Sequence, residues 1–230
     1  MSADAGTLLS KEHKLLRVQR LALEELRGAD LADRCAAAGY AWGPAGARIR
    51  FLGVEHALEP GAARLRRDDL EGDAGDASAA LERRLSEEIV LLHYLARTPG
   101  RPPVGRWVGF DQLPGGAFYG GTFRLRTEAP LARAFGADPR RLIEAAAGMD
   151  AGAAAYGDAA VIVPALPRVP LLLVVWRGDD EIAANAKVLF DADAEAHLLT
   201  EDLVVLGEIV TRRLRRGTYV RGGETPCPGS

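Results

Sequence analysis

Apolar residues recur at helical spacing in four stretches of the chain. The first begins after Ser10, a suitable N-cap, and ends at Gly39, so we expect one helix there. The strongest pattern covers residues 81–97, whose last two turns are apolar nearly all round, which predicts a central core helix. A short helix is expected after Asp138, its N-cap, with Pro139 at the first helical position and Gly148 as its stop.

The last helical pattern follows Asp193 or Thr200, either of which could cap it. Its apolar face consists of Leu203, Leu206, Val210 and Leu214. Arginines gather at its C-terminal end, where cations complement the helix dipole. This pattern predicts a helix near the C-terminus of the chain.

Strand patterns occupy the segments between these helices. Apolar and polar residues alternate around Ile49 and Val54, with a turn expected at Gly53. Three prolines confine the next strands to 159–163 and 171–176, because proline cannot donate a ladder hydrogen bond, and a further strand is expected over 186–191. The glycine-rich aromatic segment 104–126 reads as strand, turn and strand.

Helices and strands are mixed without regular alternation, which favours an α+β fold. We expect a single domain over residues 1–216, with a mixed or antiparallel sheet packed against the central helix and the N- and C-terminal helices. The polar, glycine-rich stretch at 60–80 is expected to be a mobile loop within it. The tail at 217–230 is expected to be disordered.

Composition narrows the class of protein. The 230 residues carry a formal net charge of −3, which gives no general attraction to nucleic acid or to an anionic membrane. The longest apolar run, 171–176, is too short to cross a bilayer, and the N-terminus lacks the apolar core of a signal peptide. Two cysteines, Cys35 and Cys227, are too few for a disulfide framework or an iron–sulfur cluster. We therefore expect a cytoplasmic protein that binds neither nucleic acid nor membrane.

Acidic residues follow the apolar run that ends at Trp176. Asp179, Asp180 and Glu181, with Asp191 after the next strand, could converge at one end of a sheet and bind a hard cation or act as acid and base. The alternative is a polar turn that solvates one end of a buried hairpin, which is the commoner role for such acids.

Two histidines lie on separate predicted elements. His93 falls in the most apolar helix, and His197 precedes Glu201 by four residues, a spacing that allows a carboxylate to orient an imidazole. Together they could ligate a tetrapyrrole metal, zinc or iron, or each could be a satisfied core residue. Tyr119, between paired glycines, could stack on a flat ligand or belong to a tight turn.

Several segments, in this order, resemble a bacterial and archaeal family, domain-of-unknown-function family 3786. The resemblance covers roughly 8–216 and is most specific over 157–202. The segments that carry it are "LLHYLAR", "GRWVGFDQLPGGAFYGGTF", "PLARAFG", "GDAAVIVPALPRVPLLLVVWRGDDEI" and "KVLFDADAEAHLLTED".

The resemblance implies a context rather than an activity: anaerobic metabolism with metal and corrinoid chemistry, in which some members carry an appended four-cysteine iron–sulfur module. This sequence lacks those cysteines, so a corrinoid or iron–sulfur protein would have to act as its partner. The positions characteristic of the family are those of His93, Asp158, Trp176, Asp180, Glu181, Asp191 and His197.

Three functions are compatible with this pattern. The first is an accessory protein that binds a corrinoid, a haem or a divalent metal, with His93 or His197 as a ligand and Trp176 and Tyr119 as walls. The second is a metal-dependent enzyme whose metal ligands are Asp158, Asp180, Glu181 and Asp191. The third is a protein-interaction domain without catalytic activity, and the sequence does not name an oligomeric state.

Overall fold

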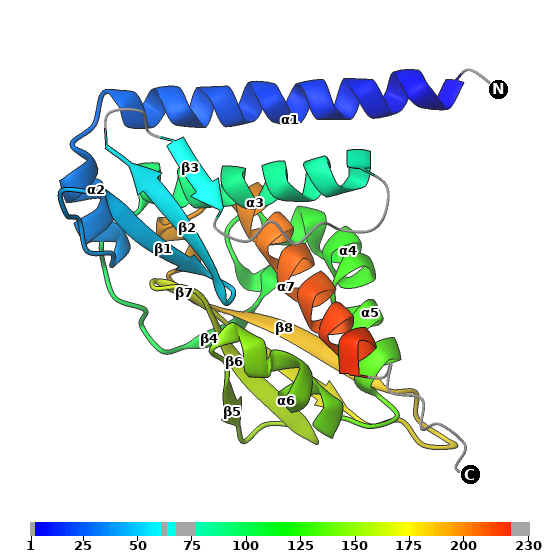
Figure 1. Ribbon diagram of the computed structural model, residues 1–230. Coiled ribbons are helices and arrows are strands. Elements are labelled where there is room, and N and C mark those ends of the chain that lie inside the picture. The colour runs from blue at the N-terminus through cyan, green and yellow to red at the C-terminus, as the bar shows by residue number, and fades with distance from the viewer. Residues whose placement is uncertain (1–2, 61–63, 68–76, 222–230) are drawn as a thin grey trace, which may run out of the picture. The chain divides into compact units, whose positions relative to one another are not determined.

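A computed structural model describes residues 3–60, 64–67 and 77–221 of the chain (Figure 1). It contains helices and two antiparallel sheets, which confirms the predicted α+β class. The chain divides into two compact units. The first comprises residues 1–102 and 194–205, and the second comprises residues 103–193 and 206–230.

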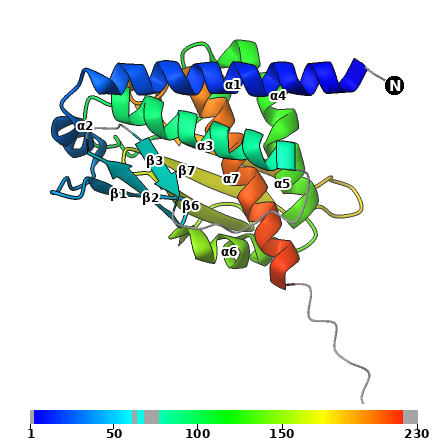
Figure 2. The same cartoon turned by 45° about the horizontal axis from the view of Figure 1, so that its top comes forward.

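Helices α1, α2 and α3 belong to the N-terminal segment of the first unit. Helix α1 (Ala3–Arg27) lies beside α3 (Ala77–Arg97), as both views show (Figures 1 and 2). The single helix predicted over 10–39 is wrong, because the chain breaks after Arg27 and α2 (Leu31–Ala38) begins anew. Asp30 causes this restart: its carboxylate accepts the backbone N–H groups of Ala32 and Asp33 at the start of α2.

A three-stranded antiparallel sheet completes the first unit, in the order β1 (Ala47–Phe51), β2 (Val54–Glu59) and β3 (Arg64–Arg67). The predicted turn between the first two strands is confirmed, and both of its residues, Leu52 and Gly53, have positive φ angles of 51° and 82°. Two consecutive positive φ angles give the turn a twist that suits a two-residue hairpin. Residues 61–63 and 68–76 of the expected mobile loop lie outside the described residues.

The second unit contains a five-stranded antiparallel sheet in the order β4-β8-β7-β6-β5. The strands are β4 (Trp107–Gly109), β5 (Gly152–Ala154), β6 (Ala159–Leu166), β7 (Val169–Trp176) and β8 (Asn185–Asp191). The predicted limits at the prolines were too narrow, since β6 passes through Pro164 and β7 includes Pro170. The register shifts between Val163 and Leu166, and such an irregularity accommodates a residue that cannot donate to the ladder.

The prediction of strand, turn and strand over residues 104–126 is wrong for the second half of this segment. After β4 and a short 3-10 helix (Phe110–Gln112), residues Gly116–Arg126 form helix α4. Phe123 of α4 stacks on Phe110, with ring centroids 4.2 Å apart, and also contacts Phe190 of β8. This buried aromatic cluster holds the glycine-rich segment as a helix, because packing of one apolar residue outweighs the weak helical preference of glycine.

Two short helices follow in the second unit, α5 (Glu128–Phe135) and α6 (Arg140–Ala146), the latter continued by a 3-10 turn (Ala147–Met149). The sequence pattern predicted α6 but not α5. Helix α6 begins one residue later than predicted, with Pro139 rather than Asp138 at the N-cap, and no side chain caps it there. Helix α5 contacts β7 and β8, and α6 contacts β6, so both helices pack on the sheet.

The last helix, α7 (Thr200–Arg221), follows a 3-10 turn (Ala194–Ala196). Its predicted face is confirmed, because all four of its apolar residues are buried: Leu203, Leu206, Val210 and Leu214. Residues 200–205 belong to the first unit and the later residues to the second. The predicted tail from 217 overlaps the end of this helix, and residues 222–230 lie outside the described part of the chain.

Candidate functional site

A histidine and an aspartate 109 residues apart in the sequence meet in the first unit. His93 lies in the penultimate turn of α3, and Asp202 lies in the first turn of α7. His93 Nδ1 is 2.8 Å from Asp202 Oδ1, and the two side chains are only 12% and 10% exposed. The pair is therefore largely shielded from water without being sealed.

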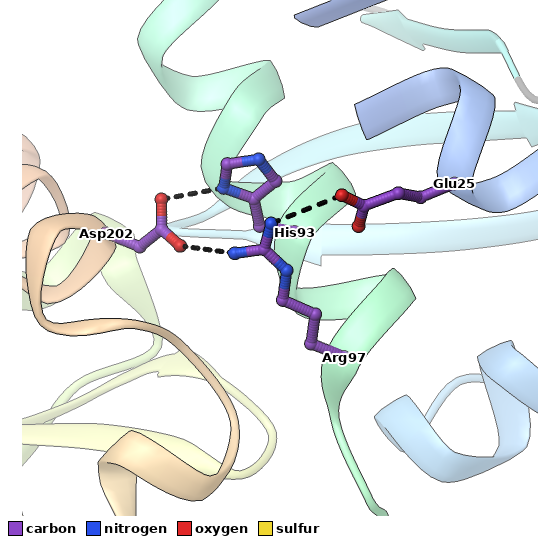
Figure 3. Close-up of polar contacts among 4 residues, drawn as sticks. All are labelled: Glu25, His93, Arg97 and Asp202. Carbon is purple, nitrogen blue, oxygen red and sulfur yellow. Dashed lines mark hydrogen bonds and ion pairs between the residues drawn. The ribbon is translucent and has the colours of Figure 1, made fainter. Parts of the chain in front are cut away.

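Two further charged side chains extend this pair (Figure 3). Arg97, one helical turn after His93, places Nη1 3.5 Å from the second oxygen of Asp202 and Nη2 3.4 Å from Glu25 of α1. Both oxygens of Asp202 thus face a nitrogen donor. Arg97 fixes the carboxylate against which the imidazole is oriented.

Positive potential surrounds Asp202 from two sources. Its position in the first turn of α7 places it at the positive end of the helix dipole, and Arg97 adds a full positive charge. An ionised carboxylate can only accept, so Nδ1 of His93 donates the proton of this hydrogen bond. In the neutral imidazole the lone pair then resides on Nε2, and no described residue hydrogen-bonds to that atom. This is the arrangement of a histidine prepared to ligate a metal or accept a proton.

His197 also lies in the first unit, but in a different environment. It is completely buried, and its Nδ1 is 2.7 Å from Oγ1 of Thr98. Its ring lies 6.4 Å from that of Tyr94, which is also fully buried. Glu201 is exposed and makes no hydrogen bond among the described residues, so the expectation that it orients His197 is wrong. His197 is placed as a hydrogen-bonded core residue.

The acids that follow Trp176 lie in the second unit and shape a turn. The carboxylate of Asp179 accepts the backbone N–H groups of Glu181 and Ile182, and these hydrogen bonds lower the pKa of Asp179. Asp158 accepts the N–H of Arg177 at the same end of the β6–β7 pair. Asp180 and Glu181 are exposed. These contacts are those of the polar turn that the sequence left open as the alternative.

Asp191 lies at the other end of β8. The strand begins at Asn185, which pairs with Trp176, and six residues further, roughly 20 Å away, it ends at Asp191. Asp191 is fully buried, and its two oxygens accept the backbone N–H groups of Val104, Gly105 and Asp193 at 2.7–3.1 Å. The register therefore does not bring Asp191 together with Asp180 and Glu181, because they occupy opposite ends of one strand.

The predicted aromatic walls belong to the second unit as well. Trp176 is the last residue of β7 and is 38% exposed, whereas Tyr119 lies on α4 in edge contact with Phe118. Within residues 3–60, 64–67 and 77–221, no three His, Cys, Asp or Glu side chains gather in a way that could hold a metal ion. The roles of these residues as ligands or walls stay predictions.

The residues that support His93 were not predicted from the sequence. Asp202 was not singled out because nothing local relates it to a histidine in another helix. Arg97 follows His93 by four residues on the same helix, and this spacing was a signal that one turn joins the two side chains. No comparable spacing relates Asp202, whose carboxylate contacts both side chains, to either of them.

The fold and this site define an α+β protein with a carboxylate-supported histidine. Residues 30–213 match the family described as Domain of unknown function (DUF3786), and since the match spans most of the chain, the chain belongs to this family. No curated protein and no solved structure matches it. Among the described helices, none has the length and apolar character needed to cross a membrane.

Proposed function

We propose that the chain is an accessory protein that binds a tetrapyrrole cofactor, a corrinoid or a haem, whose metal Nε2 of His93 would hold. The observation that carries the proposal is the 2.8 Å hydrogen bond from His93 Nδ1 to Asp202. A carboxylate on the far nitrogen fixes the tautomer, orients the ring and strengthens Nε2 as a donor; most histidines that ligate metals have a carboxylate, a backbone carbonyl or a water in this position.

The number of protein donors favours a macrocycle over a bare metal ion. A metal held only by protein side chains needs three or four of them, and the described residues offer no such group. A tetrapyrrole fills four positions of its metal and needs one side chain from the protein. His93 offers this one side chain and keeps 12% of it exposed, whereas His197 is completely buried in the core. When bound, the cofactor would supply redox or group-carrier chemistry.

The proposal is tested by adding haemin or hydroxocobalamin to the purified chain under anaerobic conditions, in oxidised and reduced form. We expect a shift of the visible spectrum that saturates at one equivalent. The shift should be lost in His93→Ala and restored by free imidazole, which can occupy the vacated space. Asp202→Asn should retain the shift with affinity weakened by about 10- to 100-fold, because the neutral amide supports the imidazole less well.

His13→Ala is the matched control, since His13 is exposed on α1 and its loss should leave binding unchanged. Circular dichroism of each variant establishes that it is folded. The proposal fails if neither cofactor shifts its spectrum with the wild-type chain. It also fails if His93→Ala binds as tightly as the wild type.

A further inference from the structure

A cavity of about 660 Å³ opens on the second unit. It is lined by α4, α5, the loop between β7 and β8, and Asn185 at the start of β8. Its apolar wall consists of small residues and one leucine: Gly121, Leu125, Ala129, Ala132, Ala183 and Ala184. The volume lies within the range of roughly 300–1,000 Å³ that is usual for small-molecule sites.

The walls of the cavity are held in place by contacts behind them. Glu128, at the start of α5, accepts a hydrogen bond from Lys187 Nζ at 3.1 Å, which ties α5 to β8. Ala184 also packs closely on Gly136 and Gly178. A Cβ added to Gly136 would lie 2.2 Å from the Cβ of Ala184, and a Cβ added to Gly178 would lie 2.5 Å from the backbone nitrogen of Ala184. The cavity is therefore formed before any ligand enters, which lowers the entropy lost on binding.

The charged residues of the lining leave an excess of positive charge. Arg124 and Arg133 are exposed, and neither makes a hydrogen bond or an ion pair in the part of the chain that the structure describes. Glu128 is the acid of the lining, and Lys187 compensates its charge. Two guanidinium groups thus remain for an anion, and a guanidinium fork suits a carboxylate.

An apolar surface continues from the cavity along α4. Leu125 is 68% exposed and Phe118 is 87% exposed, and their spacing from Gly121 places all three on one face of the helix. Large apolar side chains that remain this exposed beside a cavity are typical of a binding surface. The surface would contact an apolar body longer than the cavity alone could hold.

We propose that this cavity binds an organic acid with an apolar body, such as an alkyl carboxylate. Arg124 and Arg133 bind its carboxylate, and the alanine wall and Leu125 contact its chain. Phe118 extends the apolar contact for longer chains. The site shares no residue with the His93 site, and it stands or falls independently of the proposed cofactor.

The test is calorimetric titration of the full chain with decanoate, with butyrate and inorganic phosphate as comparison ligands. We expect saturable binding of decanoate that is at least tenfold tighter than that of butyrate. Arg124→Gln and Arg133→Gln should each weaken decanoate binding roughly tenfold or more, since each removes a charge-assisted hydrogen bond.

Gly121 provides a test of location that does not threaten folding. No atom lies within 4 Å of a Cβ added there, and leucine is a better helix former than glycine. Gly121→Leu should therefore keep or raise the stability of α4 while its side chain fills the cavity and weakens decanoate binding at least tenfold. Gly121→Ala, which adds one methyl group, should change affinity less than about threefold.

Arg141→Gln is the matched charge control, because Arg141 is exposed on α6 and does not line the cavity. The proposal is overturned if decanoate does not bind, or if phosphate binds as tightly as decanoate. Equal weakening by Arg141→Gln and Arg124→Gln would show a general charge effect and would also overturn it. So would unchanged binding in Gly121→Leu.

Discussion

Replacing Asp191 tests whether its carboxylate organises the chain around β4. Its Oδ1 accepts two backbone N–H groups, from Val104 and Asp193, and Oδ2 accepts that of Gly105 at 2.7 Å. A hydrogen bond to a charged group contributes about 1.5–3 kcal/mol. Val104 is 61% exposed, so water can replace the hydrogen bond that its N–H loses. We therefore expect Asp191→Ala to lower the free energy of unfolding by about 3–5 kcal/mol.

Asparagine at this position should have an intermediate effect. Its single carbonyl oxygen can keep the two bonds of Oδ1, but its NH₂ group would face the N–H of Gly105, where two donors repel. We expect Asp191→Asn to lower the free energy of unfolding by about 2–3 kcal/mol. Urea unfolding at pH 7 measures both variants, from the midpoint with the m value held equal.

Asp180→Ala is the control, because Asp180 is an exposed acid at the other end of β8 and its loss should leave the midpoint unchanged. The reasoning is refuted if Asp191→Ala lowers the free energy of unfolding by less than about 1 kcal/mol. A chelator should not alter the difference between the variants. If it abolished the difference, Asp191 would instead act by holding a metal ion.

Three smaller perturbations test other parts of the fold. Gly207→Ala places a Cβ 2.7 Å from the buried ring of Phe123, and we expect it to lower the free energy of unfolding by about 1–3 kcal/mol. Thermal unfolding measures this, and an unchanged melting temperature would contradict the close packing. Asp30→Ala removes the cap of α2 and should cost about 1 kcal/mol, measured by urea unfolding, unless that cap is dispensable. Burial raises the pKa of Cys35 from 9.0 to about 11, so in a Cys227→Ser background its thiol should stay unreactive toward a disulfide reagent at pH 8 until the chain unfolds. Rapid labelling of the folded chain at pH 8 would contradict the burial of this thiol. Because the thiol of the unfolded chain ionises at a lower pH than that of the folded chain, the free energy of unfolding should fall as pH rises from 9 to 11.

Local patterns predicted the elements whose stability is local. The stripe of α3 and the apolar face of α7 were readable because one side of each helix is continuously buried. Helix α4 was not readable, since its helical state depends on Phe123 packing against Phe110 and Phe190, residues that lie 13 and 67 positions away. From local sequence alone, a glycine-rich segment favours a turn, and the distant contacts that make it helical cannot be inferred from it.

The candidate site shows the same division. His93 was selected from its place in the apolar helix, but its partner Asp202 and the buried role of Asp191 follow from contacts across many residues. Asp180 and Asp191 are close in sequence, yet a strand between them holds them apart. His93 and Asp202 are far apart in the sequence but in contact, whereas Asp180 and Asp191 are near in the sequence but at opposite ends of β8. Only the three-dimensional structure reveals both relations.

The shortness of the outer strands of the five-stranded sheet has a consequence for solubility. Strands β4 and β5 have three residues each and form the outer edges of the sheet, beside β8 and β6 respectively. Strand β7 lies in the middle, where its residues Leu171–Trp176 pair with β8 and most of its length pairs with β6. The run "LLLVVW", the segment of this chain best suited to cross-β aggregation, is thus concealed in the middle of the sheet. Strands of three residues give a neighbouring molecule little backbone to pair with, so β4 and β5 are poor templates for edge-to-edge aggregation. The hazard is confined to nascent or partly unfolded molecules, in which β7 has not yet found its two neighbours.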